Sequence, residues 1–314
     1  MKLGIDMGGM SIKMGLVNEE NKIIGRITIP TDLTVPYQVL VERMADAVQQ
    51  MLENAGMTLE QCGGIGIGSP GTIDAKQGVI LYSNNFGWEN VPIVEELKKH
   101  LDTRIEIAND ADAAALGEVC AGAAEGAENA VLLTLGTGVG SGVILDKKIF
   151  RGAMPGGCEL GHLSIRYDGI RCTCGRKGCL EAYASASALL RIAREKAAEH
   201  PESVMNEMCK NDLEQMNGKI PFDAAKAGDE AGMEVIKEYE GYLACGIANV
   251  INTFRPEKVI LGGGVAAQKE NLTAPLKDLV KDMCFGGSHG YIADIVTSVL
   301  GNDAGIIGAA NLVV

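Results

Sequence analysis

The chain has 314 residues and a formal net charge of −13, from 28 basic and 41 acidic side chains. A surface this acidic repels polyanions, so the composition argues against nucleic acid and membranes as partners. The sequence has no long apolar N-terminal region and no run of about 18 apolar residues. We therefore expect a cytoplasmic protein with no targeting segment, and the length favours two domains over one.

The first third of the chain predicts an α/β domain. Residues 3–29 predict three strands joined by two tight turns. Apolar residues at helical spacing predict a helix over residues 37–55, which Gly56 would end. The elements expected next are a short buried strand at 63–71, an amphipathic helix at 91–101, a strand at 104–108 and a helix that opens at Asn109-Asp110.

The plan of the first thirty residues returns later in the chain. Residues 130–150 again predict a strand, a glycine-rich turn, a strand, a hairpin and a further strand. Residues 258–266 predict another strand that enters a glycine loop. Helices are expected over residues 181–255, and a last helix over residues 303–313. Repetition of one supersecondary plan predicts two related α/β halves.

Two domains follow from this repetition. We expect a small α/β domain over residues 1–114 and a large α/β domain over residues 115–300. The C-terminal helix, about residues 301–314, is expected to pack back on the small domain. A glycine turn from each half would then face a shared cleft.

Glycine-rich turns follow the first strand of each half. Glycine lets a phosphate approach the backbone N–H groups and permits the positive φ angles that aim them. Each turn alone is equally well explained as a tight hairpin, but two at equivalent places favour phosphate binding. The residues are Asp6, Gly8 and Gly9 in the first turn, Gly136, Thr137, Gly138 and Gly140 in the second, and Gly262–Gly264 in a third loop.

Asn109 and Asp110 stand where a predicted strand ends and a helix begins. Both are preferred helix N-caps, and capping is the better interpretation for at least one of them. The carboxyl ends of strands in α/β folds also point side chains into clefts. A carboxylate at such a place can take a proton from a hydroxyl that attacks phosphorus.

Three of the nine cysteines lie within eight residues, and one histidine precedes them closely. An odd number of thiols does not suit disulfides, and the other six cysteines are scattered singly, as is typical of reduced thiols. Three thiolates and an imidazole at short spacing suit a tetrahedral zinc ion. With no open position, the metal would be structural. The expected ligands are His162, Cys172, Cys174 and Cys179.

The segments "GCELGH" and "CTCGRKGCLEAYAS" resemble the signature of the ROK family, which comprises sugar kinases and sugar-responsive repressors. "DMGGMSIK", "GIGSPGTID", "NNFGW", "NDADAAALGE", "LTLGTGVGSG" and "ILGGGV" extend the resemblance over nearly the whole chain. It implies a two-lobed actin-like ATPase fold, the duplicated ribonuclease-H-like architecture, with sugar and ATP in the interdomain cleft.

The resemblance also implies roles for individual residues. Asp110 would be the general base that takes a proton from the sugar hydroxyl. His162 would bind zinc through one ring nitrogen and the sugar through the other. The remaining sugar contacts would come from Asn109, Glu159 and Glu181, with Asn85 and Gly71. The ATP contacts would come from Gly8, Gly9, Ser11, Lys13, Thr137, Gly138, Gly262, Gly263 and Gly264.

One position departs from the family pattern, because Met10 stands where the family usually has threonine. Methionine cannot donate a hydrogen bond to phosphate, which leaves Ser11, Lys13 and the glycine N–H groups for that purpose. The sequence alone does not identify the phosphate donor.

The resemblance implies an ATP- and Mg²⁺-dependent hexose kinase, most similar to the glucokinase branch, that makes glucose 6-phosphate. Kinases of N-acetylmannosamine, allose or fructose share these motifs. A sugar-responsive repressor is a second possibility, although the first turn begins at Asp6 and the acidic charge opposes DNA binding. A chaperone-like or cytoskeletal ATPase is a third. The family precedent implies a homo-oligomer, a dimer or tetramer.

Overall fold

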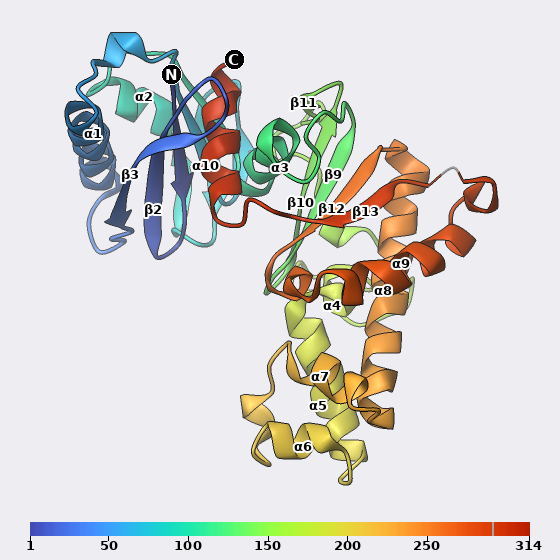
Figure 1. The fold of residues 1–314 in the computed structure, drawn as a ribbon. Coiled ribbons are helices and arrows are strands. Elements are labelled where there is room, and N and C mark those ends of the chain that lie inside the picture. The colour runs from blue at the N-terminus through green and yellow to red at the C-terminus, as the bar shows by residue number, and fades with distance from the viewer. Residues whose placement is uncertain (291) are drawn as a thin grey trace. The chain divides into compact units, whose positions relative to one another are not determined.

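The computed structural model describes residues 1–290 and 292–314, and the chain forms two compact units. The first unit comprises Met1–Leu132, Gly142–Cys158 and Val299–Val314, and the second comprises Leu133–Ser141 and Glu159–Ser298. Figure 1 shows the elements of both units in chain order. The division into domains of residues 1–114 and 115–300 stays a prediction.

A five-stranded sheet in the order β3-β2-β1-β4-β8 forms the centre of the first unit (Figure 1). The hairpins β1-β2 and β2-β3 are antiparallel, whereas β1-β4 and β4-β8 are parallel. This confirms the three N-terminal strands and the strands expected at 63–71 and 104–108. The bounds are β1 Lys2–Met7, β2 Ser11–Val17, β3 Ile23–Pro30, β4 Ile65–Ser69 and β8 Ile105–Asn109.

Helices α1 (Tyr37–Asn54) and α2 (Ile93–Lys98) bury apolar side chains in the same core as this sheet. The stripe predicted for α1 is confirmed, because the residues expected on its inner face are all buried. Burial of such a stripe stabilises the helix more than its intrinsic propensity does. The stripe is Val41, Met44, Val48, Met51 and Leu52.

A small antiparallel sheet, β5-β6-β7, lies between these elements in sequence. Sequence patterns did not reveal it, because its strands have three to five residues and glycine and asparagine interrupt the segment. Runs this short have no readable two-residue period. The bounds are β5 Thr72–Asp74, β6 Val79–Ser83 and β7 Trp88–Val91.

The second large sheet has the order β11-β10-β9-β12-β13, which repeats the connection plan of the first. The repetition expected from the sequence is therefore confirmed. The last strand and helix α9 had not been predicted. The strands are β9 Ala130–Leu135, β10 Val139–Leu145, β11 Lys148–Ile149, β12 Lys258–Gly262 and β13 Asp294–Thr297.

Most helices of the chain belong to the second unit, as the sequence predicted for residues 181–255. The long helix α8 packs against α5, α7 and α9, as Figure 1 shows. Among residues 1–290 and 292–314, no helix combines the length and apolarity needed to cross a bilayer. The bounds are α4 Glu181–Ala184, α5 Ala186–Glu199, α6 Val204–Met208, α7 Ile220–Lys226, α8 Glu230–Phe254 and α9 Glu270–Met283.

Helix α10 (Asp303–Ala310) packs closely on α3 (Asp110–Ala121) and on β1. Glycines make this approach possible. A Cβ atom on Gly308 would overlap the carbonyl oxygen of Ala113, and one on Gly117 would overlap that of Ala304. The spacing between the two helices therefore depends on the absence of side chains at these positions.

We expect Gly308→Ala to lower the free energy of unfolding by about 1–3 kcal/mol or more, because overpacking against backbone cannot relax. Urea unfolding followed by circular dichroism would measure it. The matched control is Gly241→Ala on α8, where an added Cβ meets no atom within 4 Å. That variant should be as stable as wild type or gain up to about 1 kcal/mol. Equal effects of the two substitutions would contradict this packing argument.

Candidate active site and metal cluster

The carboxyl end of β8 carries the two polar residues that the sequence singled out. Asn109 is the N-cap of α3: its Oδ1 accepts hydrogen bonds from the N–H groups of Ala111 and Asp112, at 2.8 and 3.4 Å. This confirms the capping interpretation for one of the pair. Its Nδ2 donates to the carbonyl oxygen of Gly71 at 3.1 Å. One amide side chain thus joins the helix start to the loop after β4.

Asp110 is the first residue of α3, and its Oδ1 accepts a hydrogen bond from the N–H of Ala111 at 2.9 Å. Burial raises the pKa of Asp110, because a carboxylate loses hydration inside the protein. A carboxyl group with a raised pKa at the end of a strand is suited to accept a proton from a bound substrate.

Asp6 is a second half-buried carboxyl group of the first unit, and the sequence placed it in the first glycine turn. Burial raises its pKa, the positive charge of Lys13 opposes the shift, and the charge of Asp110 adds to it. Gly305 of α10 leaves room for the Asp6 carboxylate, since a Cβ there would lie 2.9 Å from its Cγ atom. The sequence signal for this group was a carboxylate directly before a glycine turn. Two neighbouring carboxylates of this kind attract a cation.

The first glycine turn is closed by backbone hydrogen bonds. The N–H of Gly8 donates to the carbonyl oxygen of Ser11 at 3.0 Å, and the Thr31 hydroxyl donates to the carbonyl oxygen of Gly8 at 2.6 Å. Met10 is 91% exposed and contributes its carbonyl oxygen to the N–H of Thr31. Its side chain is therefore not needed to hold the turn.

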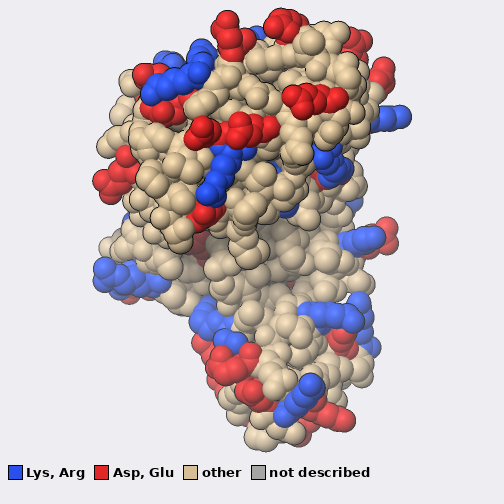
Figure 2. Space-filling view, turned by 90° about the vertical axis from the view of Figure 1, so that its left-hand side faces the viewer, with Lys and Arg blue, Asp and Glu red and all other residues tan. Residues whose placement is uncertain are grey.

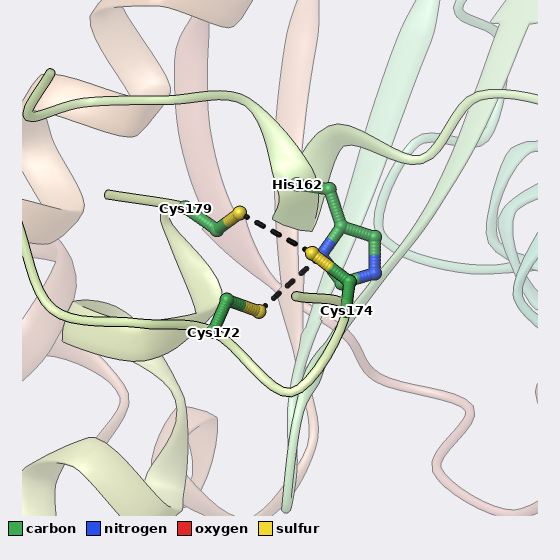
Figure 3. A group of neighbouring side chains, drawn as sticks. All are labelled: His162, Cys172, Cys174 and Cys179. Carbon is green, nitrogen blue, oxygen red and sulfur yellow. Dashed lines mark hydrogen bonds between the residues drawn. The ribbon is translucent and has the colours of Figure 1, made fainter. Parts of the chain in front are cut away.

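The second unit brings together the four residues predicted to bind metal. One ligand atom from each lies within 4.8 Å of all the others. Figure 3 shows the imidazole of His162 and the three thiols converging from separate segments of the chain. His162 ends a 3₁₀ turn at Leu160–His162, and the thiols come from the loop 172–179.

The distances in this cluster fit a tetrahedral metal. The Cys174 and Cys179 sulfur atoms are 3.7 Å apart, and Cys172 Sγ lies 3.7 Å from His162 Nδ1. Zinc–sulfur bonds of about 2.3 Å in a tetrahedron place two sulfurs about 3.8 Å apart. Because Nδ1 of His162 faces the thiols, Nε2 is the ring nitrogen on the other side. The residue set can therefore hold zinc.

Glu181 lies between this cluster and the second glycine turn. Its Oε1 accepts hydrogen bonds from the Thr173 hydroxyl at 3.1 Å and the Cys172 thiol at 3.3 Å. Its Oε2 accepts one from the N–H of Val139 at 3.1 Å. Glu159 is exposed and directly precedes the 3₁₀ turn that carries His162. Two of the predicted sugar contacts thus flank metal-cluster residues.

The two predicted nucleotide loops of the second unit lie side by side. Thr137 and Gly138 form the turn between β9 and β10, which the bond from the N–H of Gly136 to the carbonyl oxygen of Gly138 closes at 3.0 Å. Gly263, with φ 83°, begins the loop after β12. Its Cα faces the backbone of Leu135, where a Cβ would find no space.

The first unit has a cavity of about 150 Å³ beside Asn109. Residues 73–76 line one side of it, and residues 151–157 line another. The second of these segments, "RGAMPGG", carried no motif that the sequence analysis recognised. The cavity offers polar and charged groups next to Asn109, including Asp112 and Arg151.

The predicted site residues therefore form two groups. Within the first unit, hydrogen bonds join Gly71 to Asn109, while Asn85 lies exposed between β6 and β7. Within the second, Glu181 joins the cysteine loop to the glycine turn. The first group comprises Gly8, Gly9, Ser11, Lys13, Gly71, Asn85, Asn109 and Asp110, and the second Thr137, Gly138, Glu159, His162, Cys172, Cys174, Cys179, Glu181 and Gly262–Gly264.

The model of the ROK family matches residues 2–314. The chain belongs to the ROK family. It is 36% identical to a glucokinase of Thermotoga maritima over 99% of this chain and 96% of that protein. It is 29% identical to a xylose repressor of Caldicellulosiruptor bescii, of which it covers 77%.

Among solved structures, a ROK family glucokinase of Streptomyces griseus in complex with glucose and AMPPNP is 32% identical. The TM-score is 0.79, and the match covers 99% of this chain and 98% of that one. Similarity of this extent confirms the predicted actin-like ATPase fold, with its duplicated α/β plan.

We expect Asp110→Asn to raise the free energy of unfolding near neutral pH. Burial raises the pKa of Asp110, so its stabilising contribution is complete below the ordinary aspartate pKa and is lost as pH rises through the folded value. Asparagine escapes that loss. Urea unfolding of both proteins should show a gap at about pH 7.5 that closes near pH 4.

Asp46→Asn, which alters an exposed carboxylate of α1, is the control and should produce no such pH-dependent gap. An Asp110→Asn protein less stable than wild type at neutral pH would contradict the role of burial.

Proposed function

We propose that this chain is an ATP-dependent hexose kinase that converts glucose to glucose 6-phosphate. One observation carries the proposal: a half-buried carboxyl group with raised pKa, Asp110, stands at the end of β8 beside Asn109. It does so in a chain that is similar over its whole length to glucokinases.

In the proposed reaction, Asp110 is the general base. The substrate hydroxyl donates a proton to the Asp110 carboxylate while its oxygen attacks the γ-phosphorus of ATP; the bond from that phosphorus to the β,γ-bridging oxygen breaks, and ADP leaves. The hydrogen bond from the N–H of Ala111 to Asp110 Oδ1 fixes the direction of the carboxylate. Because Asn109 caps the same helix, both residues present their side chains from a rigid start of α3.

The other hydroxyls of the sugar are held by amide, carboxylate and imidazole groups. Asn109, which also hydrogen-bonds the loop at Gly71, is one proposed contact. Glu159, His162 and Glu181 are the others. Groups of this kind reject sugars that leave them unpaired, which makes hydroxyl stereochemistry the basis of selectivity.

ATP phosphates are bound by the backbone N–H groups of the glycine turns, with Ser11 and Lys13 in the first turn and Thr137 and Gly138 in the second. Asp6 is the carboxylate of this chain best placed to hold Mg²⁺ near the first turn, since it lies near the end of β1, just before that turn, and is close enough to Asp110 for their charges to interact. Bound Mg²⁺ supplies charge neutralisation for the transferred phosphoryl group.

The metal cluster is proposed to hold structural zinc. The ligands are those that converge in Figure 3, and zinc bound there fixes the tautomer and direction of the His162 ring. With Nδ1 on the metal, Nε2 of His162 remains to contact a sugar hydroxyl. A homo-oligomer, dimer or tetramer, is also proposed, on the family precedent alone.

A sugar-responsive repressor is the second candidate, because similarity to the xylose repressor extends over 99% of this chain. The net charge of −13 favours the kinase. On the face shown in Figure 2, Lys and Arg lie scattered among Asp and Glu rather than gathered in one area. Retention on duplex DNA at low salt, if tight and dependent on sequence, would favour the repressor.

The first measurement is ADP release from Mg-ATP with glucose, N-acetylmannosamine, mannose, allose, fructose and N-acetylglucosamine. We expect a clear preference for glucose. Preference for another sugar would keep the mechanism and change the substrate. Failure with every sugar would contradict ATP as the phosphate donor. Polyphosphate would then be tried as donor with glucose, and turnover would indicate that the first turn, which contains Met10, binds polyphosphate instead of ATP.

In the same assay, Asp110→Asn should lower kcat by about a hundredfold or more, the usual contribution of a general base. Glucose binding measured by calorimetry should persist, because the amide keeps the shape of the carboxyl group. Near-normal turnover would contradict the general-base role and leave Asp110 as a residue that only begins helix α3.

Protein purified without chelators should contain about one zinc per chain. Cys174→Ala should lose the metal, since its sulfur is one of four converging ligand atoms. Cys245→Ala on α8, which changes a thiol outside the cluster, should retain it. Wild-type protein without zinc, or equal zinc in both variants, would contradict the assignment.

A further inference from the structure

The second glycine turn is bordered by the segment that carries His162 and by residues 181–186, which follow the cysteine loop. From one side, the N–H of Leu160 donates to Ser141 Oγ at 2.9 Å, and Gly161 lies so close to the carbonyl oxygen of Val139 that a Cβ would overlap it. From the other side, the N–H of Ala186 donates to the carbonyl oxygen of Gly136 at 2.8 Å. The turn is thus enclosed between the segment that carries His162 and the start of α5.

Glu181 makes the central contact on that second side. Its Oε2 accepts the N–H of Val139, the first residue after the turn. Its Oε1 is held by the hydroxyl of Thr173 in the cysteine loop. A carboxylate with donors on both oxygens has a fixed orientation, and a bond from a backbone N–H to a charged acceptor is stronger than a neutral one.

Gly138 explains why this contact is so close. A Cβ on Gly138 would overlap Glu181 Oε2, and the three nearest atoms that it would meet all belong to Glu181. No positive φ is recorded for Gly138, so the backbone itself tolerates alanine. Glycine at this position therefore makes room for the Glu181 carboxylate, and a side chain here would displace that carboxylate from the Val139 N–H.

We propose that Glu181 is a positioning residue for the nucleotide turn, and that its carboxylate fixes the Val139 N–H and so the shape of residues 136–139. This inference rests on the proposed function, in which that turn binds ATP phosphates. It adds a second task to a residue otherwise expected to contact the sugar. Sugar contact and turn geometry then depend on one side chain held by the cysteine loop.

A double-mutant cycle on ADP binding tests this role. Glu181→Ala and Gly138→Ala should each weaken ADP binding by about tenfold or more, because each removes the same charged hydrogen bond. In the double variant, Gly138→Ala should add no more than about a twofold effect, since the atoms it would strike are gone. Calorimetry without sugar measures the affinities.

Two further variants distinguish a positioning role of Glu181 from a general disruption of the turn. Glu181→Gln keeps an oxygen acceptor for the Val139 N–H and should restore most of the ADP affinity. Gly136→Ala, whose Cβ would approach only the Gly138 carbonyl oxygen at 4.0 Å, should change ADP affinity by the same factor with or without Glu181. Zinc content and the free energy of unfolding of each variant show whether the cluster and the fold survive.

Additive effects of the two substitutions, with ADP bound normally by wild type, would overturn the role of Glu181 and leave the proposed function standing. Absence of ADP binding by wild type would overturn both. Amide hydrogen exchange gives a reading that needs no ligand. Val139 should exchange faster in Glu181→Ala than in wild type, and unchanged exchange at Val139 would also overturn the proposal.

Discussion

Parallel pairing of β1, β4 and β8 is the constraint on which the candidate catalytic groups depend. Parallel strands end at the same edge of a sheet, so residues far apart in sequence arrive together. The register pairs Asp6 with Gly68, and Ser69 with Asn109. The same edge therefore carries Asp6, the loop that leads to Gly71, and the start of α3 with Asp110.

Collecting carboxyl groups at one edge has an energetic consequence. Burial raises the pKa of both Asp6 and Asp110, which means that their charged forms destabilise the folded protein at neutral pH. The surrounding structure offsets this cost through close packing. Helix α10 approaches α3 and β1 so tightly that Gly4, Gly117 and Gly308 have no room for a side chain. The close packing of α10 on α3 and β1 thus supports the edge of the sheet that carries Asp6 and Asp110.

The second unit contains most of a long loop with little regular secondary structure, between β11 and α4. Residues 159–180 contain one 3₁₀ turn and two isolated bridges and no longer helix or strand, so regular backbone hydrogen bonds fix little of this loop. The converging thiols and imidazole offer an alternative, because a metal bound by them would replace many weak contacts with four directed bonds. Glu181 comes two residues after Cys179. Its carboxylate accepts a hydrogen bond from the N–H of Val139 and so links the cysteine loop to the start of β10.

The sequence alone determined the elements with long periodic patterns and the chemistry with strict spacing. Helix α1 was readable because its buried stripe, from Val41 to Leu52, spans about three turns, and the metal cluster because Cys172, Cys174, Cys179 and His162 lie close in sequence. Short strands such as β5 and β7 carried no periodic signal.

Tertiary structure alone decided the contacts between residues distant in sequence. That Asp6 lies against Gly305, that Asn109 holds Gly71 and that Gly138 makes room for Glu181 follow from strand pairing and loop closure. A one-dimensional pattern records which residue types are present and how they alternate. It does not record which backbone atoms come within 3 Å of them, because that depends on how the sheets and helices pack.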